Sequence, residues 1–297
     1  MLRNKVAAMG LPGMQTRITL IGVIISAIMV ANAAAALAKP DCPDKCGDVE
    51  IPFPFGMTED CYLDKSFNIT CDNNTARVGT VPVTHISIES HELRVLQYVA
   101  RDCYNSTGVR VQYNKANFWA AMYTISSTKN KFTAVGCDTY AYLGGEQNGE
   151  NYWTGCMSLC SSLRNVVNES CNGIGCCEVE LPVGLKNISM KVGSYYNHTN
   201  VSEFNPCGYA FVVEQGQFNF SSDYLRNISS EMLPMVLDWA IGNEKCREAT
   251  RNKTNFACKG NSECHDLHSR DGYHCKCKQG YQGNPYLDDG CQGIIHL

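Results

Sequence analysis

The chain has 297 residues, 44% of them hydrophobic and 18% charged, with a formal net charge of -4 at pH 7. This apolar content excludes a wholly disordered chain, and an acidic balance without any run of Lys and Arg excludes nucleic acid as a partner. The 18 cysteines, an even number without an evident redox motif, indicate the oxidising secretory route and up to nine disulfides. The composition therefore argues against a cytosolic enzyme.

The N-terminal residues 1–38 have the order of a targeting segment. Three basic residues precede the apolar run 18–30, and a stretch of small residues ends at Ala38. A basic region, an apolar region and small residues in this order are typical of a secretory signal peptide. The pattern predicts a signal peptide over residues 1–38 that is cleaved before Lys39, with an uncleaved membrane anchor as the alternative.

Residues 39–243 form the larger of two expected domains, a mainly β, disulfide-rich domain. Short segments rich in Val, Ile, Thr, Tyr and Phe alternate with Gly, Asn and Asp, as strands and turns do. Ser222 is expected to cap a short helix that runs to Asn227, and the apolar run 232–241 to pack against this domain. A loop is expected around Gly144, Gly145 and Gly149. The expected strands are 78–89, 93–100, 118–125, 132–137, 176–181, 187–192 and 209–214.

Six cysteines crowd into residues 246–291 with the spacing C-x11-C-x5-C-x10-C-x-C-x13-C. So short a module cannot bury a large core, and disulfides worth roughly 2–4 kcal/mol each are expected to carry its stability. Zinc binding is disfavoured, because no C-x2-C pair stands at a matching distance from His. The spacing, followed by Gly280-Tyr281, resembles an EGF-like domain. That resemblance implies the pairs Cys246 with Cys264, Cys258 with Cys275, and Cys277 with Cys291.

Ten Asn-x-Ser/Thr sequons occur along the chain, which is a high density for a protein of this length. A chain in the secretory route with this density is expected to carry several glycans on solvent-facing Asn side chains. The candidate glycosylation sites are Asn68, Asn73, Asn105, Asn168, Asn187, Asn197, Asn200, Asn219, Asn227 and Asn252.

Several motifs identify a family. The larger domain begins with C-P-D-K-C-G-D-V-E-I-P-F-P-F-G over residues 42–56 and continues with V-G-C-D at 135–138, G-I-G-C-C at 173–177 and V-L-D-W-A-I at 236–241. The smaller module contains G-Y-Q-G-N-P-Y-L at 280–287. Together these motifs resemble the ectodomain of plant wall-associated receptor kinases, which is a galacturonan-binding domain followed by an EGF-like domain.

The resemblance implies a non-catalytic extracellular protein that binds pectin, especially galacturonan, at the cell wall or the plasma-membrane surface. It implies domains at 39–243 and 244–292, with a short tail at 293–297. Complete members continue with a second EGF-like module, a membrane span and a kinase. Because this sequence carries none of these, a truncated soluble ectodomain is expected, with a decoy or co-receptor that binds other ectodomains as the alternative. No cofactor or protein-bound metal is expected, and calcium is expected only as a bridge between pectin chains.

A site for a polyanion on an acidic protein requires a local cluster of cations. Residues 77–131 hold seven Lys and Arg residues against three acidic ones. Each exposed ion pair contributes only about 0–1 kcal/mol, so affinity would require many contacts and would weaken with salt. A solvated face without a ligand is the alternative. The candidate polysaccharide-binding residues are Arg77, Arg94, Arg101, Arg110, Lys115, Lys129, Lys131 and Trp119.

Aromatic and histidine side chains occur in the same stretch. Four aromatic residues could stack on sugar rings, but their places in expected strands favour core packing. Two histidines would gain charge in a mildly acidic wall, which predicts tighter binding near about pH 5.5 than near about pH 7. The aromatic residues are Tyr98, Tyr113, Trp119 and Tyr123, and the histidines are His85 and His91.

A secreted hydrolase that acts on the same polymer is the rival class. Glu178 and Glu180 would project from one side of a strand about 7 Å apart, a separation found between the carboxylates of inverting glycosidases. A solvated strand face gives the same pattern, however, and no phosphate-binding loop or G-x-S-x-G turn is present. The sequence therefore predicts no enzyme activity.

Overall fold

The computed structural model describes residues 37–120, 122–147, 149–252, 255–267 and 270–294. Leu37–Leu297 form one compact unit, and the expected signal peptide lies outside the described residues except for its last two. Those two take part in the fold, because Ala38 is buried and the carbonyl oxygen of Leu37 accepts hydrogen bonds from the Phe53 amide and Asn284 Nδ2, at 2.9 and 2.8 Å. Over these ranges, no helix is both long and apolar enough to cross a bilayer.

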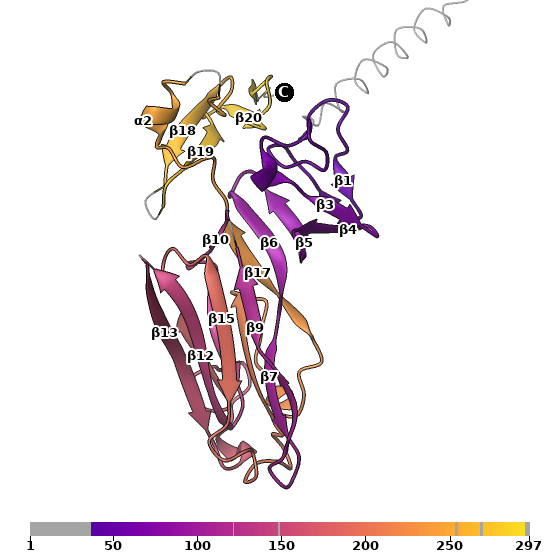
Figure 1. The fold of residues 1–297 in the computed structure, drawn as a ribbon, viewed down its shortest axis with the longest axis vertical. Coiled ribbons are helices and arrows are strands. Elements are labelled where there is room, and N and C mark those ends of the chain that lie inside the picture. Colours follow the sequence, from indigo (N-terminus) through magenta and orange to yellow (C-terminus); the bar gives the residue numbers. More distant parts are fainter. Residues whose placement is uncertain (1–36, 121, 148, 253–254, 268–269, 295–297) are drawn as a thin grey trace, which may run out of the picture. The chain divides into compact units, whose positions relative to one another are not determined.

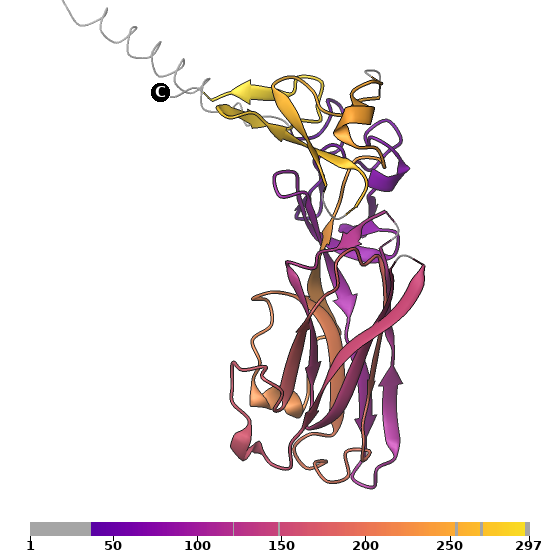
Figure 2. The same cartoon turned by 90° about the vertical axis from the view of Figure 1, so that its left-hand side faces the viewer.

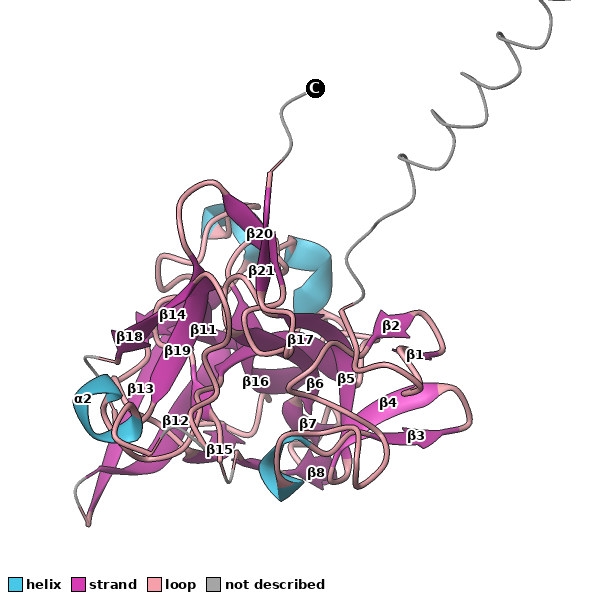
Figure 3. Cartoon of the chain, turned by 90° about the horizontal axis from the view of Figure 1, so that it is seen from above, coloured by secondary structure: helices cyan, strands magenta, loops and turns pink. Residues whose placement is uncertain are grey.

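Three antiparallel sheets hold most of the strands of the described chain (Figures 1 and 3). The six-stranded sheet has the order β10-β17-β6-β5-β4-β3, the five-stranded sheet β14-β11-β16-β7-β8, and the four-stranded sheet β13-β12-β15-β9. Their strands are β3 Thr70–Asp72, β4 Thr75–Val78, β5 Val81–Ser87, β6 Glu92–Tyr98, β7 Ala100–Tyr104, β8 Arg110–Asn114, β9 Ala116–Trp119, β10 Thr124–Ile125, β11 Asn130–Val135, β12 Asp138–Gln147, β13 Glu150–Leu159, β14 Cys176–Glu180, β15 Asn187–Gly193, β16 Cys207–Glu214 and β17 Met232–Asp238.

Smaller elements complete the fold. Three two-stranded sheets pair β1 Lys45–Cys46 with β2 Val49–Glu50, β18 Ser262–Asp266 with β19 Tyr273–Cys277, and β20 Tyr281–Gly283 with β21 Cys291–Gly293. The described helical segments are short turns (Figure 2): η1 Lys65–Phe67, η2 Leu163–Asn165, η3 Ser222–Leu225 and α2 Cys246–Ala249. The expected mainly β, disulfide-rich architecture is thus confirmed.

The structure corrects three local expectations. The strand expected at 118–125 is two strands in different sheets, β9 and β10. Of the loop expected around Gly144, Gly145 and Gly149, only Gly149 lies in the turn between β12 and β13, whereas Gly144 and Gly145 are in the interior of β12. The short helix is capped by Ser221 rather than Ser222, because the Ser221 hydroxyl accepts the Asp223 amide hydrogen bond at 3.3 Å.

The expected boundary near Asn243 does not interrupt the hydrophobic core. The run 232–241 packs against the larger domain as expected, since β17 lies between β10 and β6. Trp239 follows this strand and is buried against the ring of Phe55 in the larger domain and that of Tyr286 in the smaller module, with centroids 5.4 and 5.6 Å apart. One aromatic cluster therefore stabilises both parts of the chain.

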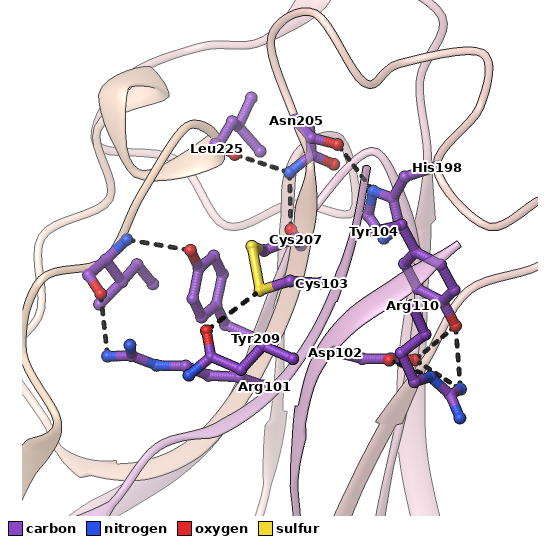
Figure 4. The surroundings of a disulfide bond; sticks show 12 residues. Arg101, Asp102, Cys103, Tyr104, Arg110, His198, Asn205, Cys207, Tyr209 and Leu225 are labelled. Atoms are coloured by element: carbon purple, nitrogen blue, oxygen red, sulfur yellow. Dashed lines mark hydrogen bonds and ion pairs between the residues drawn. A yellow bond between two sulfur atoms is a disulfide. The ribbon is translucent and has the colours of Figure 1, made fainter. Parts of the chain in front are cut away.

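All 18 cysteines form disulfides, and none is free. In the smaller module the pairs are Cys246–Cys264, Cys258–Cys275 and Cys277–Cys291, the pattern that the EGF-like resemblance implies. The larger domain holds Cys42–Cys61, Cys46–Cys71, Cys103–Cys207, Cys137–Cys160, Cys156–Cys177 and Cys171–Cys176. Cys103–Cys207 crosses directly between β7 and β16 (Figure 4).

Two histidine rings stack where the smaller module meets the larger domain. The rings of His91 and His274 are parallel, with centroids 3.8 Å apart. His91 Nε2 lies 3.2 Å from the carbonyl oxygen of Cys275, and His274 Nε2 contacts that of Trp239. Burial lowers the pKa of His91 to about 3 and that of His274 to about 4. The expectation that His91 gains charge in a mildly acidic wall is therefore wrong, because its ring lies in the core.

We expect this histidine pair to make folding sensitive to acid. In the unfolded chain both side chains take up protons near about pH 6.5, whereas the folded pair does so only near pH 3 to 4. Folding stability should therefore fall as the pH decreases from about 6.5 toward about 3. Asp238 acts in the opposite direction, because burial raises its pKa to about 6. The expected net loss in the free energy of unfolding is about 3 kcal/mol between pH 7 and pH 4.5.

Denaturant unfolding at several pH values measures this loss. His274→Gln should flatten the pH dependence, whereas His85→Gln, at an exposed position on β5, should leave it unchanged. A free energy of unfolding that stays constant down to about pH 4.5 in the parent chain would contradict the acid sensitivity expected of the His91–His274 pair.

Candidate functional site

One face of the four-stranded sheet points away from the core. Side chains alternate along each strand, so that Leu143 of β12, Met190 of β15 and Phe118 of β9 are buried. The residues between them lie on the other face, where the register aligns them across neighbouring strands. Figure 1 shows the four strands β13, β12, β15 and β9 side by side. The outward rows are Asn151, Glu146, Asn187 and Trp119; Trp153, Gly144, Ser189 and Asn117; Gly155, Tyr142 and Lys191; and Met157, Tyr140 and Gly193.

Glycines on this face make room for aromatic rings. A Cβ atom on Gly144 would lie 2.7 Å from ring atoms of Trp153, and one on Gly193 would lie 2.6 Å from the ring of Tyr140. Both distances are too short for a side chain, so each ring occupies the space above a glycine. The result is a sheet surface on which aromatic rings lie close to the backbone.

Aromatic side chains remain exposed here. Trp119 is 77% exposed, Trp153 is 52% exposed, and Tyr98 on the neighbouring β6 is 56% exposed. Core packing was expected for four aromatic residues, and only Tyr123 is buried; the expectation is wrong for Tyr98, Trp119 and Tyr113, which is 42% exposed. The latter two lie on β9 and β8, which are the edge strands of their sheets. Exposed aromatic clusters favour a ligand contact.

A groove of about 710 Å³ lies along this surface. One side comes from β6 and the start of β5, including Tyr98 and Pro82, and the other comes from β9, β15, β12 and β13, including Trp119 and Trp153. Gln97 Nε2 of β6 donates to the carbonyl oxygen of Asn117 in β9, at 3.3 Å, where the two sheets meet. The groove has the size and the mixed aromatic and polar lining of a small-molecule or sugar site.

Two cations accompany the aromatic rings. The Nζ atom of Lys191 lies 4.6 Å from the ring centroid of Trp153, in the range of a cation–π contact. Lys115 directly precedes β9 and is exposed, and strand alternation places it on the side of Asn117 and Trp119. Among the described residues, neither lysine forms an ion pair with a carboxylate. Positive charge is therefore available next to the groove.

Four of the seven predicted cations are already paired with carboxylates. Arg94 forms two hydrogen bonds of 2.5 Å with Glu214, and Arg110 contacts the buried Asp102 at 2.7 Å. Figure 4 shows Arg110 beside Asp102 and the hydroxyl of Tyr104. The other two pairs are Lys129 with Glu92 and Lys131 with Glu180. These partners reduce the charge that each cation offers to a polyanion.

The remaining predicted cations, Arg77, Arg101 and Lys115, have different surroundings. Arg101 donates to the carbonyl oxygens of Ile228 and Ser230, at 2.9 and 2.7 Å, and packs against the Tyr209 ring. Arg77 donates to the carbonyl oxygen of Thr80, which lines the groove, at 2.9 Å. The structure thus does not join the seven residues into one stripe. Of the eight candidate residues, Trp119 lines the groove, Lys115 lies on the same strand side as Trp119, and Arg77 contacts the groove residue Thr80.

The sequence of the chain is similar to that of known proteins. The family described as wall-associated receptor kinase galacturonan-binding matches residues 42–97. Wall-associated receptor kinases 2 and 5 of Arabidopsis thaliana are 40% and 42% identical to this chain over 86% and 87% of its length. By sequence, the chain is related to the wall-associated receptor kinases. It spans about a third of those relatives, 35% of each. No solved structure matches it significantly.

The family-matched segment meets the aromatic sheet at the groove. Residues 80–82 and 96–97 belong to the matched segment and form one side. Trp119, Trp153 and Ser189 lie outside that segment and form the other side. The groove therefore requires both parts of the larger domain.

Most of the ten sequons of the chain are exposed. Eight Asn side chains lie at exposed positions, and Asn68 and Asn187 are half-buried. Asn187 is the one glycosylation-site asparagine of the ten that lines the groove.

The carboxylates suggested for hydrolysis lie elsewhere. Glu178 and Glu180 are on β14, the edge of the five-stranded sheet, where Glu178 accepts a hydrogen bond from the Thr133 hydroxyl at 3.3 Å and Glu180 pairs with Lys131. Glu146 is the single carboxylate among the residues lining the groove. Within the described part of the chain, no group of three or more His, Cys, Asp or Glu side chains is arranged to hold a metal ion.

Sequence reasoning missed Trp153, Tyr142 and Lys191. A signal was present, since aromatic residues and glycines alternate at every second position in Y-A-Y-L-G at 140–144 and in W-T-G at 153–155. Such alternation over a paired hairpin predicts rings on one face above glycines on the neighbouring strand. Lys191 joins them only through the pairing of β12 with β15, which lies nearly fifty residues further along the chain.

Proposed function

We propose that this protein binds galacturonan, the acidic polymer of pectin, in the groove between β6 and the four-stranded sheet, without cleaving it. The observation that carries the proposal is the exposure of Trp119 and Trp153 beside Lys115 and Lys191. A sugar ring has an apolar face that can pack on an aromatic ring, and each galacturonate adds a carboxylate. Lysine is the complementary charge for that carboxylate.

The family description supports the choice of polymer. It names galacturonan binding for residues 42–97, and that segment supplies Thr80, Pro82 and Leu96 to the groove. An extracellular location at the cell wall agrees with the kinship to wall-associated receptor kinases and with the nine disulfides, which persist in oxidising compartments.

Replacing single lysines tests whether the polymer binds in this groove or at the cations of residues 77–131 that the sequence suggested. Lys191→Gln and Lys115→Gln should each weaken binding of a defined oligogalacturonide by roughly two- to fivefold, which corresponds to about 0.5–1 kcal/mol for an exposed ion pair. Added salt should reduce the difference between variant and parent, because it screens the same interaction. Isothermal titration calorimetry at two salt concentrations measures both effects.

Lys131→Gln is the matched control, because Glu180 already pairs with Lys131 away from the groove. Its affinity should equal that of the parent chain. A larger loss from Lys131→Gln than from Lys191→Gln would contradict the groove assignment, and new reducing ends in the titration mixture would contradict binding without cleavage.

A further inference from the structure

Asn187 combines a glycosylation signal with a position inside the groove. It is the first residue of β15 and lies opposite Trp119 of β9 in the sheet register. Asn187-Ile188-Ser189 is a sequon, and all three residues line the groove. The Asn187 Oδ1 atom is buried and has no hydrogen-bond partner among the described atoms. The side chain is therefore held on the groove face without being fixed by a polar contact.

A glycan on this side chain would begin inside the groove. Neighbouring strands lie about 4.8 Å apart, so the first sugar attached to Asn187 Nδ2 would be within reach of the Trp119 ring. The groove, at about 710 Å³, is large enough to hold sugar residues. The same rings and the same space are those assigned above to galacturonan.

We propose that Asn187 carries an N-linked glycan that occupies the groove, so that glycosylation of Asn187 and binding of galacturonan exclude each other. The binding half of this inference rests on the proposed function. The remaining sequons do not line the groove, and glycans there would leave it open. Occupancy of one site would thus set the fraction of molecules able to bind the polymer.

The experiment compares the secreted full chain with three variants made in the same glycosylating cells. Asn187→Gln removes the acceptor, Ser189→Ala removes the sequon while keeping Asn187, and Asn219→Gln removes an exposed sequon as the control. Glycopeptide mass spectrometry measures occupancy of Asn187 in each protein. The first two variants remove the same glycan by different substitutions, so an effect shared by both comes from the loss of the glycan and not from a folding defect of one variant.

Acrylamide quenching of tryptophan fluorescence reads the groove without any polymer. Trp119 and Trp153 are exposed in the groove, whereas Trp239, the third tryptophan, is 1% exposed. With Asn187 occupied, quenching should be weaker in the unmodified chain and in Asn219→Gln than in Asn187→Gln and Ser189→Ala. Oligogalacturonide affinity should rise about tenfold on loss of the glycan, which is the smallest change we regard as exclusion.

Three outcomes overturn the inference. The first is a secreted chain in which Asn187 carries no glycan. The second is equal quenching in all four proteins, which would place the glycan outside the groove, and the third is equal oligogalacturonide affinity with and without the glycan, which would show that the two do not exclude each other. If Asn187→Gln shows increased quenching but neither it nor Ser189→Ala binds oligogalacturonide, the glycan is placed as proposed. The proposed function then fails, and the exclusion fails with it.

Discussion

Replacing both Trp119 and Trp153 with alanine is expected to weaken oligogalacturonide binding by roughly a hundredfold. Burying an aromatic face against a sugar is worth about 1.5 kcal/mol per ring, so two rings contribute about 3 kcal/mol. Both side chains are exposed, and their loss should change the free energy of unfolding by no more than about 0.5 kcal/mol each. Calorimetric titration measures the first effect and denaturant unfolding the second.

Tyr113→Ala is the matched control for this double variant. Tyr113 is also exposed and aromatic, but it lies on β8 of the five-stranded sheet and does not line the groove. Its replacement should leave affinity unchanged. Equal losses from the control and the double variant, or no loss from either, would show that the groove is not where the polymer binds.

Replacing Trp239 with alanine is expected to lower the free energy of unfolding by about 3–5 kcal/mol. This indole is 1% exposed and packs against the rings of Phe55, Phe67 and Tyr286, with centroids 5.4, 5.9 and 5.6 Å away. Removing it leaves a cavity where the larger domain and the smaller module share a core. Denaturant unfolding under non-reducing conditions measures the loss.

Hydrogen exchange tests whether the loss of stability in Trp239→Ala affects the contact between the larger domain and the smaller module. Ile241 and Tyr273 exchange two backbone hydrogen bonds of 2.9 and 3.1 Å between the two parts. Their amides should exchange faster in Trp239→Ala, whereas Trp119→Ala, which removes an exposed indole, should leave them protected. A stability loss below about 1 kcal/mol would contradict the assignment of Trp239 to the shared core.

The sequence predicted the parts of the fold that local patterns determine. Strands such as 187–192 and 209–214 were recognised because β-branched and aromatic residues recur between turn residues, and β15 and β16 confirm them. β12 was missed because Gly144 and Gly145 usually interrupt strands. Here the rings of Trp153 and Tyr152 occupy the space above these glycines, a compensation visible only once β12 and β13 are paired.

Charge counting along the chain could not locate the site, because it ignores distant partners. Arg94 is neutralised by Glu214, which is 120 residues further along the chain. Conversely, Lys191 lies outside the stretch 77–131 and comes next to the groove residue Trp153 only through the pairing of β15 with β12. Trp119 was a candidate from the sequence and lines the groove, yet its exposure follows from its place on an edge strand, which its local sequence does not reveal.

The most direct test of the binding groove is acrylamide quenching of Asn187→Gln, whose groove is free of any glycan, with and without saturating oligogalacturonide. Of the three tryptophans, Trp119 and Trp153 line the groove and Trp239 is buried, so the exposed signal comes from the groove. We predict that the polymer protects this fluorescence until quenching approaches that of the Trp119→Ala/Trp153→Ala variant. Unchanged quenching at a polymer concentration that saturates binding by calorimetry would contradict the account.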